Sequence, residues 1–393
     1  MKLLCVASAL DIELNYGCTP AWWQFLKGLH ELGHDVIAIP YAGHAFSTPW
    51  WRSYPNPCEI EGRAFGAVKR WFGGGATSIH EGAGGRLSKT LIDTWVRPRW
   101  HSHVERILLQ EHNVDAVIVF SVPVNHFTGI PARIRSRFNV PVYFFDGDVP
   151  ASLPRYGGFA SGFRGYDGAN LSEYDGFMCN SVAGADELTH MGARRVATIH
   201  WGVDPELYAP VIAPKEYDVF FYGYGVEYRE EWFENMVITP SNALGDASFA
   251  IGGKGFPPTP LHVRYTGNVP FNGLRQACAR ARINLNVARS THADVDGSST
   301  LRLFELAAMG CCIVTNPIVG LERWFEHGKE VLVVHSADEA ADTYRRLLAN
   351  PAECEAFGVA ARQRVSAEHT HRHRAAQIAS FAAENSPVGP TSM

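Results

Sequence analysis

The chain has 393 residues, of which 46% are hydrophobic and 19% are charged, so an intrinsically disordered chain is excluded and two packed domains are expected. The net charge of −5 arises without any block of Lys or Arg, which argues against nonspecific nucleic-acid binding. A nucleic acid is therefore not an expected partner, although a local basic groove stays compatible with this net charge.

The beginning of the chain reads as a first β-strand. Residues 2–9 are a short apolar run that Asp11 and Glu13 follow at once, which is unlike a secretion signal. No apolar run reaches the roughly 18 residues of a membrane-spanning helix, so we expect no transmembrane segment. The 8 cysteines include no C-x-x-C pair, which favours free thiols in a reducing cytoplasm. The oligomeric state is not indicated.

The first half alternates strands with helices. Short apolar runs without clean alternation predict parallel strands covered on both faces, at residues 3–8, 35–39, 116–120, 140–145, 176–179 and 196–200. Helices are predicted between them, at residues 20–32, 127–137 and 183–191. Gly17 lies in the first loop, and Gly33 is the stop signal of the first helix. This βαβ pattern predicts a doubly wound α/β sheet.

Residues 41–99 interrupt the pattern with a long irregular insertion. The segment is rich in Gly, Pro and Trp, including Trp50, Trp51, Trp71 and Trp95. Long irregular segments in compact domains are usually functional or mobile. Aromatic faces stack on sugars and lipids, so the insertion is a candidate acceptor-binding region; a hydrophobic lid packed on the domain is the alternative.

A change of character near residue 205 predicts a linker and a second domain. Residues 205–216 contain three prolines in ten positions, as interdomain linkers often do. A second βα series follows, with strands predicted at residues 217–222, 247–251, 262–265, 283–287, 311–315 and 331–334. Three helices are predicted to close the chain, at residues 337–348, 352–367 and 371–383.

Residues 298–334 have the features of an anion site. A hydroxyl-rich turn precedes a short helix that Gly310 closes, and a helix N-terminus offers free N–H groups and partial positive charge. Arg302 and Glu305 lie three residues apart, so they share one face of that helix. The arginine can bind a phosphate while the carboxylate accepts hydrogen bonds from sugar hydroxyls. This combination predicts binding of a nucleotide sugar.

Four stretches in order resemble one enzyme family. They are the Gly17 loop with the helix ending in LHELGHDV, HWGVDPELYAP at residues 200–210, LRLFELAAMGCCIVTNPIVGLERWF at residues 301–325, and EHTHRHRAAQIASF at residues 368–381. The chain resembles a retaining glycosyltransferase of the GT-B fold, similar to family 4 (glycosyl transferases group 1) and to the spore-maturation CgeB-type glycosyltransferases.

The resemblance implies two Rossmann-like domains facing a cleft and a last helix that crosses back to the first domain. The implied boundaries are 1–204 for an acceptor-binding domain, 205–216 for the linker, 217–367 for a donor-binding domain, and 368–393 for the crossover helix and tail. It implies transfer of a sugar from a nucleoside diphosphate sugar, UDP by default, to a hydroxyl of an unidentified acceptor. Retention is implied, and no metal cofactor is expected because protein cations can neutralise the diphosphate.

The resemblance also assigns candidate donor-binding residues. The turn at residues 297–300 would present N–H groups to the diphosphate, Arg302 would support that charge, and Glu305 would bind the ribose. Arg229 and Lys254 are candidate phosphate-binding cations. The complete donor-binding set is Gly17, Arg229, Lys254, Ser298, Ser299, Thr300, Arg302 and Glu305.

Two departures from family 4 bear on catalysis. The family has two glutamates separated by seven residues; Glu305 supplies the second, but the first falls at Gly297, which makes Asp294 or Asp296 a substitute near the sugar. Where the family often has a histidine after the strand PVYFFDGDV, this chain has Asp146. Asp146 or Asp148 could orient the acceptor or take its proton. Asp146, Asp148 and Asp296 are therefore the candidate catalytic residues.

Simpler explanations exist for each motif. The D-x-D triplets at residues 146–148 and 294–296 fit a divalent metal or ordinary loop caps. Glu305 could only pair with Arg302, and Arg229 could only begin a solvated helix. The histidines of HTHRHR, spaced by two, fit a capped helix start better than a metal cluster, and His126 could be catalytic or structural.

Two other functions stay open at the level of sequence. One is a nucleotide-sugar epimerase or hydrolase on the same architecture. The other is a noncatalytic nucleotide- or carbohydrate-binding relative, an alternative that the missing first glutamate keeps open.

Overall fold

The structure is a computed structural model that describes residues 1–10, 21–62, 89–156, 165–225 and 228–384. The chain forms two compact units: the first contains strands β1 to β7 and the last residues from 375, and the second contains residues 200–374. Among the described helices, none combines the length and apolar character that crossing a bilayer demands.

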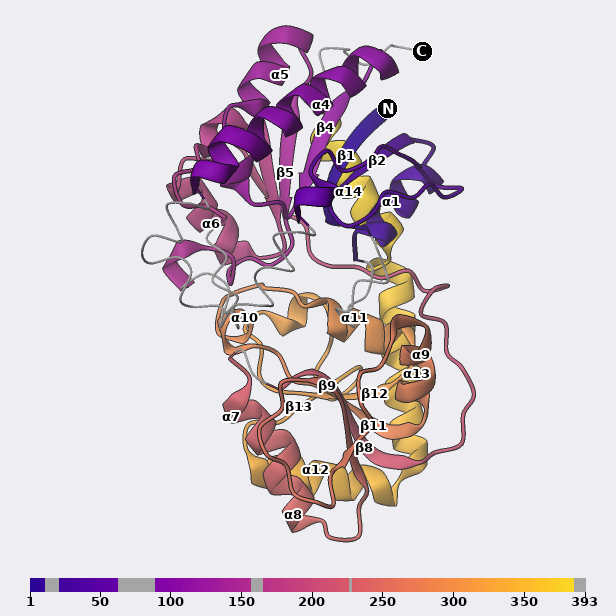
Figure 1. The fold of residues 1–393 in the computed structure, drawn as a ribbon. Coiled ribbons are helices and arrows are strands. Elements are labelled where there is room, and N and C mark those ends of the chain that lie inside the picture. The colour runs from indigo at the N-terminus through magenta and orange to yellow at the C-terminus, as the bar shows by residue number, and fades with distance from the viewer. Residues whose placement is uncertain (11–20, 63–88, 157–164, 226–227, 385–393) are drawn as a thin grey trace. The chain divides into compact units, whose positions relative to one another are not determined.

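The first unit is built on a parallel sheet with the strand order β3-β2-β1-β4-β5-β6-β7 (Figure 1). Its strands are β1 (Lys2–Ala9), β2 (Asp35–Ala42), β3 (Arg52–Ser53), β4 (Ala116–Phe120), β5 (Val142–Asp146), β6 (Gly176–Cys179) and β7 (Val196–Thr198). The order reverses between β1 and β4, which is the switch point of a doubly wound sheet.

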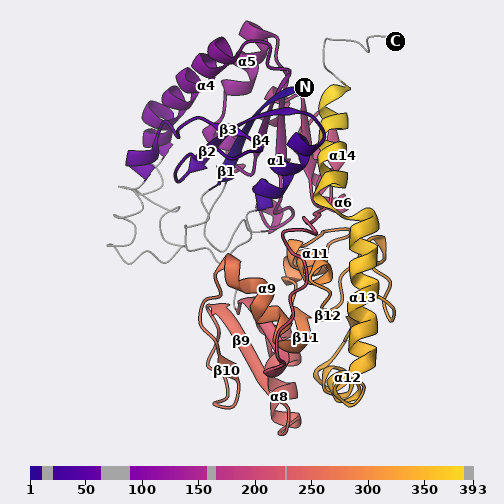
Figure 2. The ribbon, with the colours of Figure 1, turned by 90° about the vertical axis from the view of Figure 1, so that its right-hand side faces the viewer.

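Helices cover both faces of this sheet. The main ones are α1 (Ala21–Glu31), α4 (Arg97–Glu111), α5 (Ile130–Phe138), α6 (Val182–His190) and α14 (His371–Ala383). Figure 2 shows α4 and α5 on one side of the strands and α1 and α14 on the other. Phe25 of α1 packs on Phe145 of β5, and Phe381 of α14 packs on Tyr143 of the same strand.

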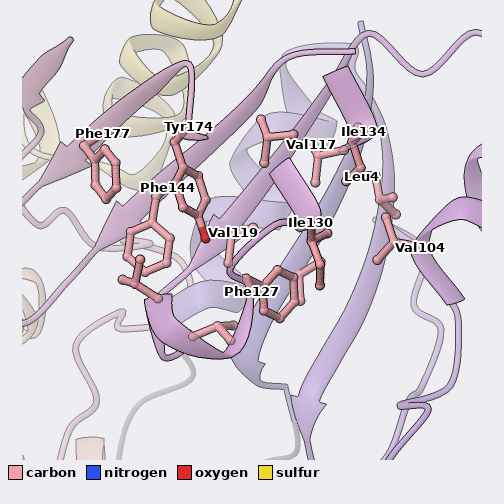
Figure 3. Packing of buried hydrophobic residues seen from close by; sticks show 14 of the residues in the cluster. Leu4, Val104, Val117, Val119, Phe127, Ile130, Ile134, Phe144, Tyr174 and Phe177 are labelled. Atoms are coloured by element: carbon pink, nitrogen blue, oxygen red, sulfur yellow. The ribbon is translucent and has the colours of Figure 1, made fainter. Parts of the chain in front are cut away.

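The α4 and α5 face holds the main apolar core of the unit (Figure 3). Alternate strand residues such as Val117 and Val119 point to this face and meet Val104 of α4 and Ile134 of α5. Each such side chain contributes about 1.5–3 kcal/mol when it leaves water. This burial holds the carboxyl ends of the strands, where the loops begin, in fixed positions.

The second unit repeats this design on a parallel sheet with the order β10-β9-β8-β11-β12-β13. Its strands are β8 (Tyr217–Tyr224), β9 (Phe249–Lys254), β10 (Arg264–Tyr265), β11 (Ala281–Asn286), β12 (Cys312–Thr315) and β13 (Leu332–Val333). The order reverses between β8 and β11, so this sheet has a switch point as well.

The helices of the second unit again lie on both faces of the sheet. They are α7 (Glu230–Phe233), α8 (Thr239–Ala243), α9 (Phe271–Ala279), α10 (Ser290–Ala293), α11 (Leu301–Ala308), α12 (Ala337–Ala349) and α13 (Pro351–Glu368). Tyr344 of α12 and Phe357 of α13 join the cluster formed by Phe221, Leu285 and Val314 of the strands. A Cβ on Gly358 of α13 would lie 2.2 Å from the carbonyl oxygen of Gly310, so this glycine lets α13 pack tightly beside the end of α11.

The chain passes from the first unit to the second after residue 199 and returns after residue 374. The two crossing segments are hydrogen-bonded to each other: Val203 N–H donates to the carbonyl of His369 at 3.1 Å, and His371 N–H donates to the carbonyl of Val203 at 2.9 Å. Arg374 adds a bond from Nε to the carbonyl of Trp201 at 3.0 Å. The start of α14 is therefore tied to the segment that enters the second unit.

Most of the elements expected from the sequence are present. The strands at 116–120 and 176–179 and the helix at 371–383 have the expected bounds. Residues 41–62 are largely irregular, as expected, but the insertion ends earlier than residue 99 because a π-helical turn, η1 (Ile92–Val96), leads into α4. Residues 321–323 form a short 3-10 turn, η6 (Leu321–Arg323), and Gly320 precedes it in a left-handed conformation.

Candidate functional site

A pocket of about 190 Å³ lies at the carboxyl edge of the second sheet. Residues at or just beyond the ends of β8, β9 and β11 line it, together with the first residues of α11. The switch point of this sheet lies between β8 and β11. The chain leads outward from β8 to β9 on one side and from β11 to β12 on the other, so the loops at the strand ends diverge and leave a crevice. We call it the cation pocket, after the basic side chains that line it: Arg229, Lys254, Arg289 and Arg302.

These four side chains give the pocket its charge. Arg229 is half-buried and donates from Nε to the carbonyl of Val287 at 2.9 Å, so it is not merely the solvated start of α7. Lys254 is exposed at the end of β9, and Arg289 is half-buried just after β11. No Asp or Glu is among the described residues that line the pocket. The site therefore attracts an anion.

Arg302 is held in place from two sides. Its guanidinium lies 4.6 Å from the ring centroid of Tyr222, and its Nη1 lies 2.9 Å from Oε2 of Glu305, one helical turn along α11. Glu305 is only 1% exposed and does not line the pocket. Burial raises the pKa of this carboxyl, and Arg302 and the hydroxyl of Tyr208 oppose that rise. Glu305 thus contacts the arginine that faces the pocket.

The turn that opens α11 contributes fewer groups to the pocket than the sequence suggested. Thr300 lines it, and its buried Oγ1 has no hydrogen-bond partner in the described part of the chain. Ser298 and Ser299 are fully buried and lie outside the lining, and Oγ of Ser299 accepts from the N–H of Trp201 at 2.9 Å. The N–H of Gly297 donates to the carbonyl of Val319 at 3.1 Å.

A close approach of two strands shapes the floor of the pocket. Gly253 on β9 has φ of +122°, and a Cβ there would lie 1.9 Å from the carbonyl oxygen of Gly223 on β8. Only glycine fits this conformation and this contact without displacing backbone. The two strand ends consequently stay open beside the basic side chains.

Asp296 lies away from this lining. Its carboxylate accepts from Nη2 of Arg323 at 2.9 Å, and its side chain is 41% exposed. Asp294 is exposed after α10. Within the described residues, no group of three or more His, Cys, Asp or Glu side chains is arranged to hold a metal ion, at either D-x-D triplet or elsewhere.

The first unit has a smaller pocket, of about 60 Å³, at the corresponding edge of its sheet. Asp146, the last residue of β5, lines it and is buried. Its Oδ2 accepts from the hydroxyls of Tyr166 at 2.5 Å and Ser152 at 2.7 Å, and its Oδ1 accepts from the N–H of Asp148 at 3.0 Å. Burial raises the pKa of Asp146 despite these donors. We call this the Asp146 pocket.

Other candidates in the first unit are placed as follows. The side chain of Asp148 is partly exposed, and this residue does not line the Asp146 pocket. His126 is in the 3-10 turn η2 (Val124–His126), with Nδ1 in contact with the hydroxyl of Tyr41, and burial lowers its pKa to about 4. Gly17 lies outside the described residues.

The tryptophans of the insertion that the structure describes differ in their exposure. Trp51 is 3% exposed, and its ring lies 5.4 Å from that of Trp23 on α1. Trp95 is instead 47% exposed, with the guanidinium of Arg99 at 4.3 Å from its ring centroid. Trp71 lies outside the described residues. The packing of Trp51 is that of a hydrophobic cover, and the exposed ring of Trp95 is compatible with contact to another molecule.

The histidine-rich segment begins a helix, as its spacing predicts. Oγ1 of Thr370 accepts from the N–H of His373 at 3.4 Å at the start of α14. His369 and His371 are buried, and burial lowers the pKa of His369 to about 3. These histidines lie in the segment that precedes the crossing between the units, and the backbone of His369 and His371 is hydrogen-bonded to Val203.

Sequence reasoning missed several residues of the cation pocket. Arg289 lies three residues beyond the end of β11, and Asn268 and Asn286 add amide groups to the lining. The available signal was positional, because β11 is the strand next to the switch point and residues just after it face the crevice. Tyr222 and Tyr208 carried no signal in the sequence, since only the packed fold brings them to Arg302 and Glu305.

One segment of the chain is similar to a known protein family. Residues 229–380 match the model of a family described as glycosyl transferase-like. No curated protein sequence shows significant similarity to the chain. The matched segment contains all four basic residues of the cation pocket, together with β11 and α11.

Solved structures share the fold over almost the whole chain. A sucrose-phosphate synthase from Thermosynechococcus elongatus is 13% identical, with 98% of this chain and 99% of that chain covered and a TM-score of 0.65. HepE from Anabaena, in complex with UDP and glucose, is 12% identical over 98% and 99%, with a TM-score of 0.61. T4 phage β-glucosyltransferase is 11% identical over 99% and 100%, with a TM-score of 0.57. The chain has the GT-B fold, as the resemblance implied.

Proposed function

We propose that the chain is a glycosyltransferase that moves a sugar from a nucleoside diphosphate sugar to an acceptor hydroxyl, with the donor diphosphate in the cation pocket. The observation that carries this proposal is the set of four basic side chains, unaccompanied by acids among the described lining residues, at the switch point of the second sheet. The unpartnered hydroxyl of Thr300 at the same place supports it, because a phosphate oxygen can accept its hydrogen bond.

The charge of the pocket suits the chemistry of transfer. As the bond between sugar and diphosphate breaks, negative charge grows on the leaving diphosphate, and fixed cations stabilise it without reorganisation. These protein cations are the reason why we propose that no metal is obligatory. UDP is the proposed carrier because structures of HepE and of T4 phage BGT contain UDP or UDP-glucose. Retention of configuration and closeness to the CgeB-type enzymes rest on the sequence resemblance alone.

Within this proposal, Glu305 supports the pocket through Arg302. The resemblance assigns ribose binding to this glutamate, but here its two oxygens meet Tyr208 and Arg302, and the side chain is outside the lining. Ser298 and Ser299, which are buried, are proposed to set the start of α11. Thr300 and the three arginines of the pocket are proposed to contact the diphosphate, with the exposed Lys254 as a charge at the rim. We propose that Asp296 influences sugar binding only indirectly, through the conformation of the loop that contains it.

For the acceptor we propose the first unit. Asp146 is a buried carboxylate with a raised pKa, which makes it a stronger base than an exposed aspartate. It lies at the carboxyl edge of a parallel sheet, where α/β proteins bind ligands. We propose that Asp146 orients the acceptor hydroxyl or takes its proton, with Asp148 in the same loop as the second candidate.

The binding test uses calorimetry and thermal shift with UDP, GDP, ADP and dTDP. A nucleotide that binds the folded chain raises its melting temperature, and the Arg289→Ala variant should weaken its binding about 10-fold or more because a charged contact is lost. The matched control is Arg282→Ala, which removes an arginine of β11 paired with Asp218 and outside the pocket. Unchanged affinity in Arg289→Ala would contradict the placement of the diphosphate.

The turnover test separates transfer from the two other functions. The chain is incubated with the sugar nucleotide that binds best, with and without a panel of hydroxyl acceptors, and products are separated by mass spectrometry. A glycosylated acceptor is the expected result. Isomerised sugar, or equally fast release without acceptor, would indicate an epimerase or hydrolase, and tight binding without any turnover would indicate a noncatalytic relative.

A further inference from the structure

The side chain of Tyr208 connects the segment that enters the second unit with α11. Tyr208 is fully buried, and its hydroxyl donates to Oε1 of Glu305 at 3.0 Å. The other oxygen of the same carboxylate, Oε2, lies 2.9 Å from Nη1 of Arg302. Tyr208 does not line the cation pocket, so it has no direct contact with a ligand there.

The backbone around Tyr208 is itself anchored. The N–H of Tyr208 donates to the carbonyl of Asp204 at 3.0 Å, and the Asp204 carboxylate accepts from the N–H of Glu206 at 2.9 Å. The ring of Tyr208 packs edge-on against Phe271 at 5.9 Å. This turn therefore presents the phenol hydroxyl to Glu305 from a defined position.

The contact has an orienting effect because Glu305 is buried. A carboxylate away from water needs polar or charged partners, and here the phenol donates a hydrogen bond to Oε1 while the guanidinium forms an ion pair at Oε2. If the phenol is lost, Oε1 loses this hydrogen bond and the carboxylate is held less firmly beside Arg302. Arg302 then keeps its contact with the Tyr222 ring, but its partner Glu305 is positioned less precisely.

We propose that Tyr208 is a positioning residue for nucleotide binding: acting through Glu305, it holds the guanidinium of Arg302 at the diphosphate position. The proposal rests on the proposed function, since it assumes that the cation pocket binds the nucleotide. Coupling of this kind is reciprocal, so an anion bound at Arg302 also stabilises the turn at residues 204–208.

The experiment compares Tyr208→Phe with Tyr344→Phe. Tyr344 is an equally buried tyrosine of the same unit, and its hydroxyl donates to the carbonyl of Met236 at 2.9 Å; neither residue lines the pocket. UDP affinity is measured by calorimetry for both variants, and unfolding by denaturant checks that both still fold. Tyr208→Phe should weaken UDP binding about 10-fold, as expected for a hydrogen bond to a charged group, and Tyr344→Phe should leave it unchanged.

A double-mutant cycle with Arg302→Ala tests the route of the effect. If Tyr208 acts through Arg302, then Tyr208→Phe has no further effect on UDP affinity once Arg302 is absent. In the unaltered chain, UDP should also slow hydrogen exchange at residues 204–208, and this protection should be lost in Tyr208→Phe. A purely structural tyrosine would lower stability but would give additive effects and unchanged protection.

The outcomes separate this inference from the function on which it rests. If the unaltered chain binds UDP and Tyr208→Phe binds it equally well, or if the effects of Tyr208→Phe and Arg302→Ala are additive, the positioning role is wrong while the function stands. If the unaltered chain binds none of the nucleotides tested, the proposed function fails and takes this inference with it.

Discussion

At the carboxyl edge of the second sheet, four basic side chains face one pocket, whereas the corresponding edge of the first sheet buries the carboxylate of Asp146 among hydroxyl donors. The two sheets are otherwise alike. Both are parallel, both reverse their strand order at an internal switch point, and both have helices on their two faces. The difference in ligand chemistry therefore comes from a few residues at the strand ends.

This contrast separates the scaffold from the site. Strand order and helix packing provide an open crevice in each unit, and the crevice alone favours no particular ligand. In our proposal, the basic residues of one unit favour a polyanion, and the carboxylate with a raised pKa in the other favours a hydroxyl group. A transferase of this design needs both, since it brings a charged donor to a neutral nucleophile.

Arg302→Met should have the largest effect on the basic side of this contrast. The change removes a pocket cation and leaves the buried Glu305 without its charged partner. We expect kcat/KM for transfer to fall by about 100-fold or more, and the free energy of unfolding to fall by about 3–5 kcal/mol. Steady-state kinetics and denaturant unfolding measure the two losses.

The matched control for that change is Arg346→Ala. This arginine pairs with Glu353 at 2.8 Å in the same unit, but its side chain is 53% exposed. Exposed ion pairs contribute at most about 1 kcal/mol, so stability should change little and activity not at all. Equal losses in the two variants would contradict the role that we propose for Arg302 in the pocket.

Asp146→Asn is the corresponding change in the first unit, with a smaller expected effect. An amide cannot accept from Tyr166, Ser152 and the Asp148 N–H as a carboxylate does. Stability should fall by about 1–3 kcal/mol. The turnover number should fall while UDP affinity stays unchanged, because the pocket proposed for the acceptor is separate from the pocket proposed for the donor. A loss of UDP affinity with unchanged turnover would contradict this assignment.

Much of the fold could be predicted from the sequence because it depends on local patterns. Short apolar runs such as residues 116–120 must be strands buried on both faces, and Gly33 and Gly310 end their helices in the left-handed conformation that favours glycine. The bounds failed where tertiary packing decides them. Residues 92–96, for example, form a π-helical turn that no periodicity indicates.

The site was predicted only in part, for a physical reason. Arg229, Lys254, Thr300 and Arg302 were found because they flank strand ends or open a helix, and position in the chain already suggests such roles. The partners of Glu305 could not be found this way, since Tyr208 lies almost 100 residues away in sequence and meets it only through packing. Side-chain direction also decides exposure, which is why buried Ser298 and Ser299 fall outside the lining.

His126 should make the first unit sensitive to acid. Burial lowers the pKa of its imidazole to about 4 from the ordinary value of 6.5, and the guanidinium of Arg97 adds to this. The unfolded chain therefore binds a proton that the folded chain resists, and stability falls as the pH drops from 6.5 towards 4.

Replacement by glutamine tests this sensitivity. Because His126→Gln removes the titrating group, the free energy of unfolding should change less with pH in this window, by about 1–3 kcal/mol. The exposed His190 supplies the control, His190→Gln, which should keep the pH dependence of the unaltered chain. Identical pH profiles for all three proteins would show that His126 is not the source.

Lys254→Ala should have the smallest effect, and it isolates the long-range part of the pocket's attraction. Lys254 is the exposed member of the four cations, so solvent and salt screen its charge far more than that of Arg302. We expect UDP affinity to fall about 3-fold at low ionic strength and the difference from the unaltered chain to vanish at about 1 M salt, where the Debye length is about 3 Å. Calorimetric titrations at both salt concentrations measure this. A salt-independent loss would mean that Lys254 contacts the diphosphate directly. All four basic side chains would then make close contacts, instead of three arginines in contact and one lysine charge at the rim of the pocket.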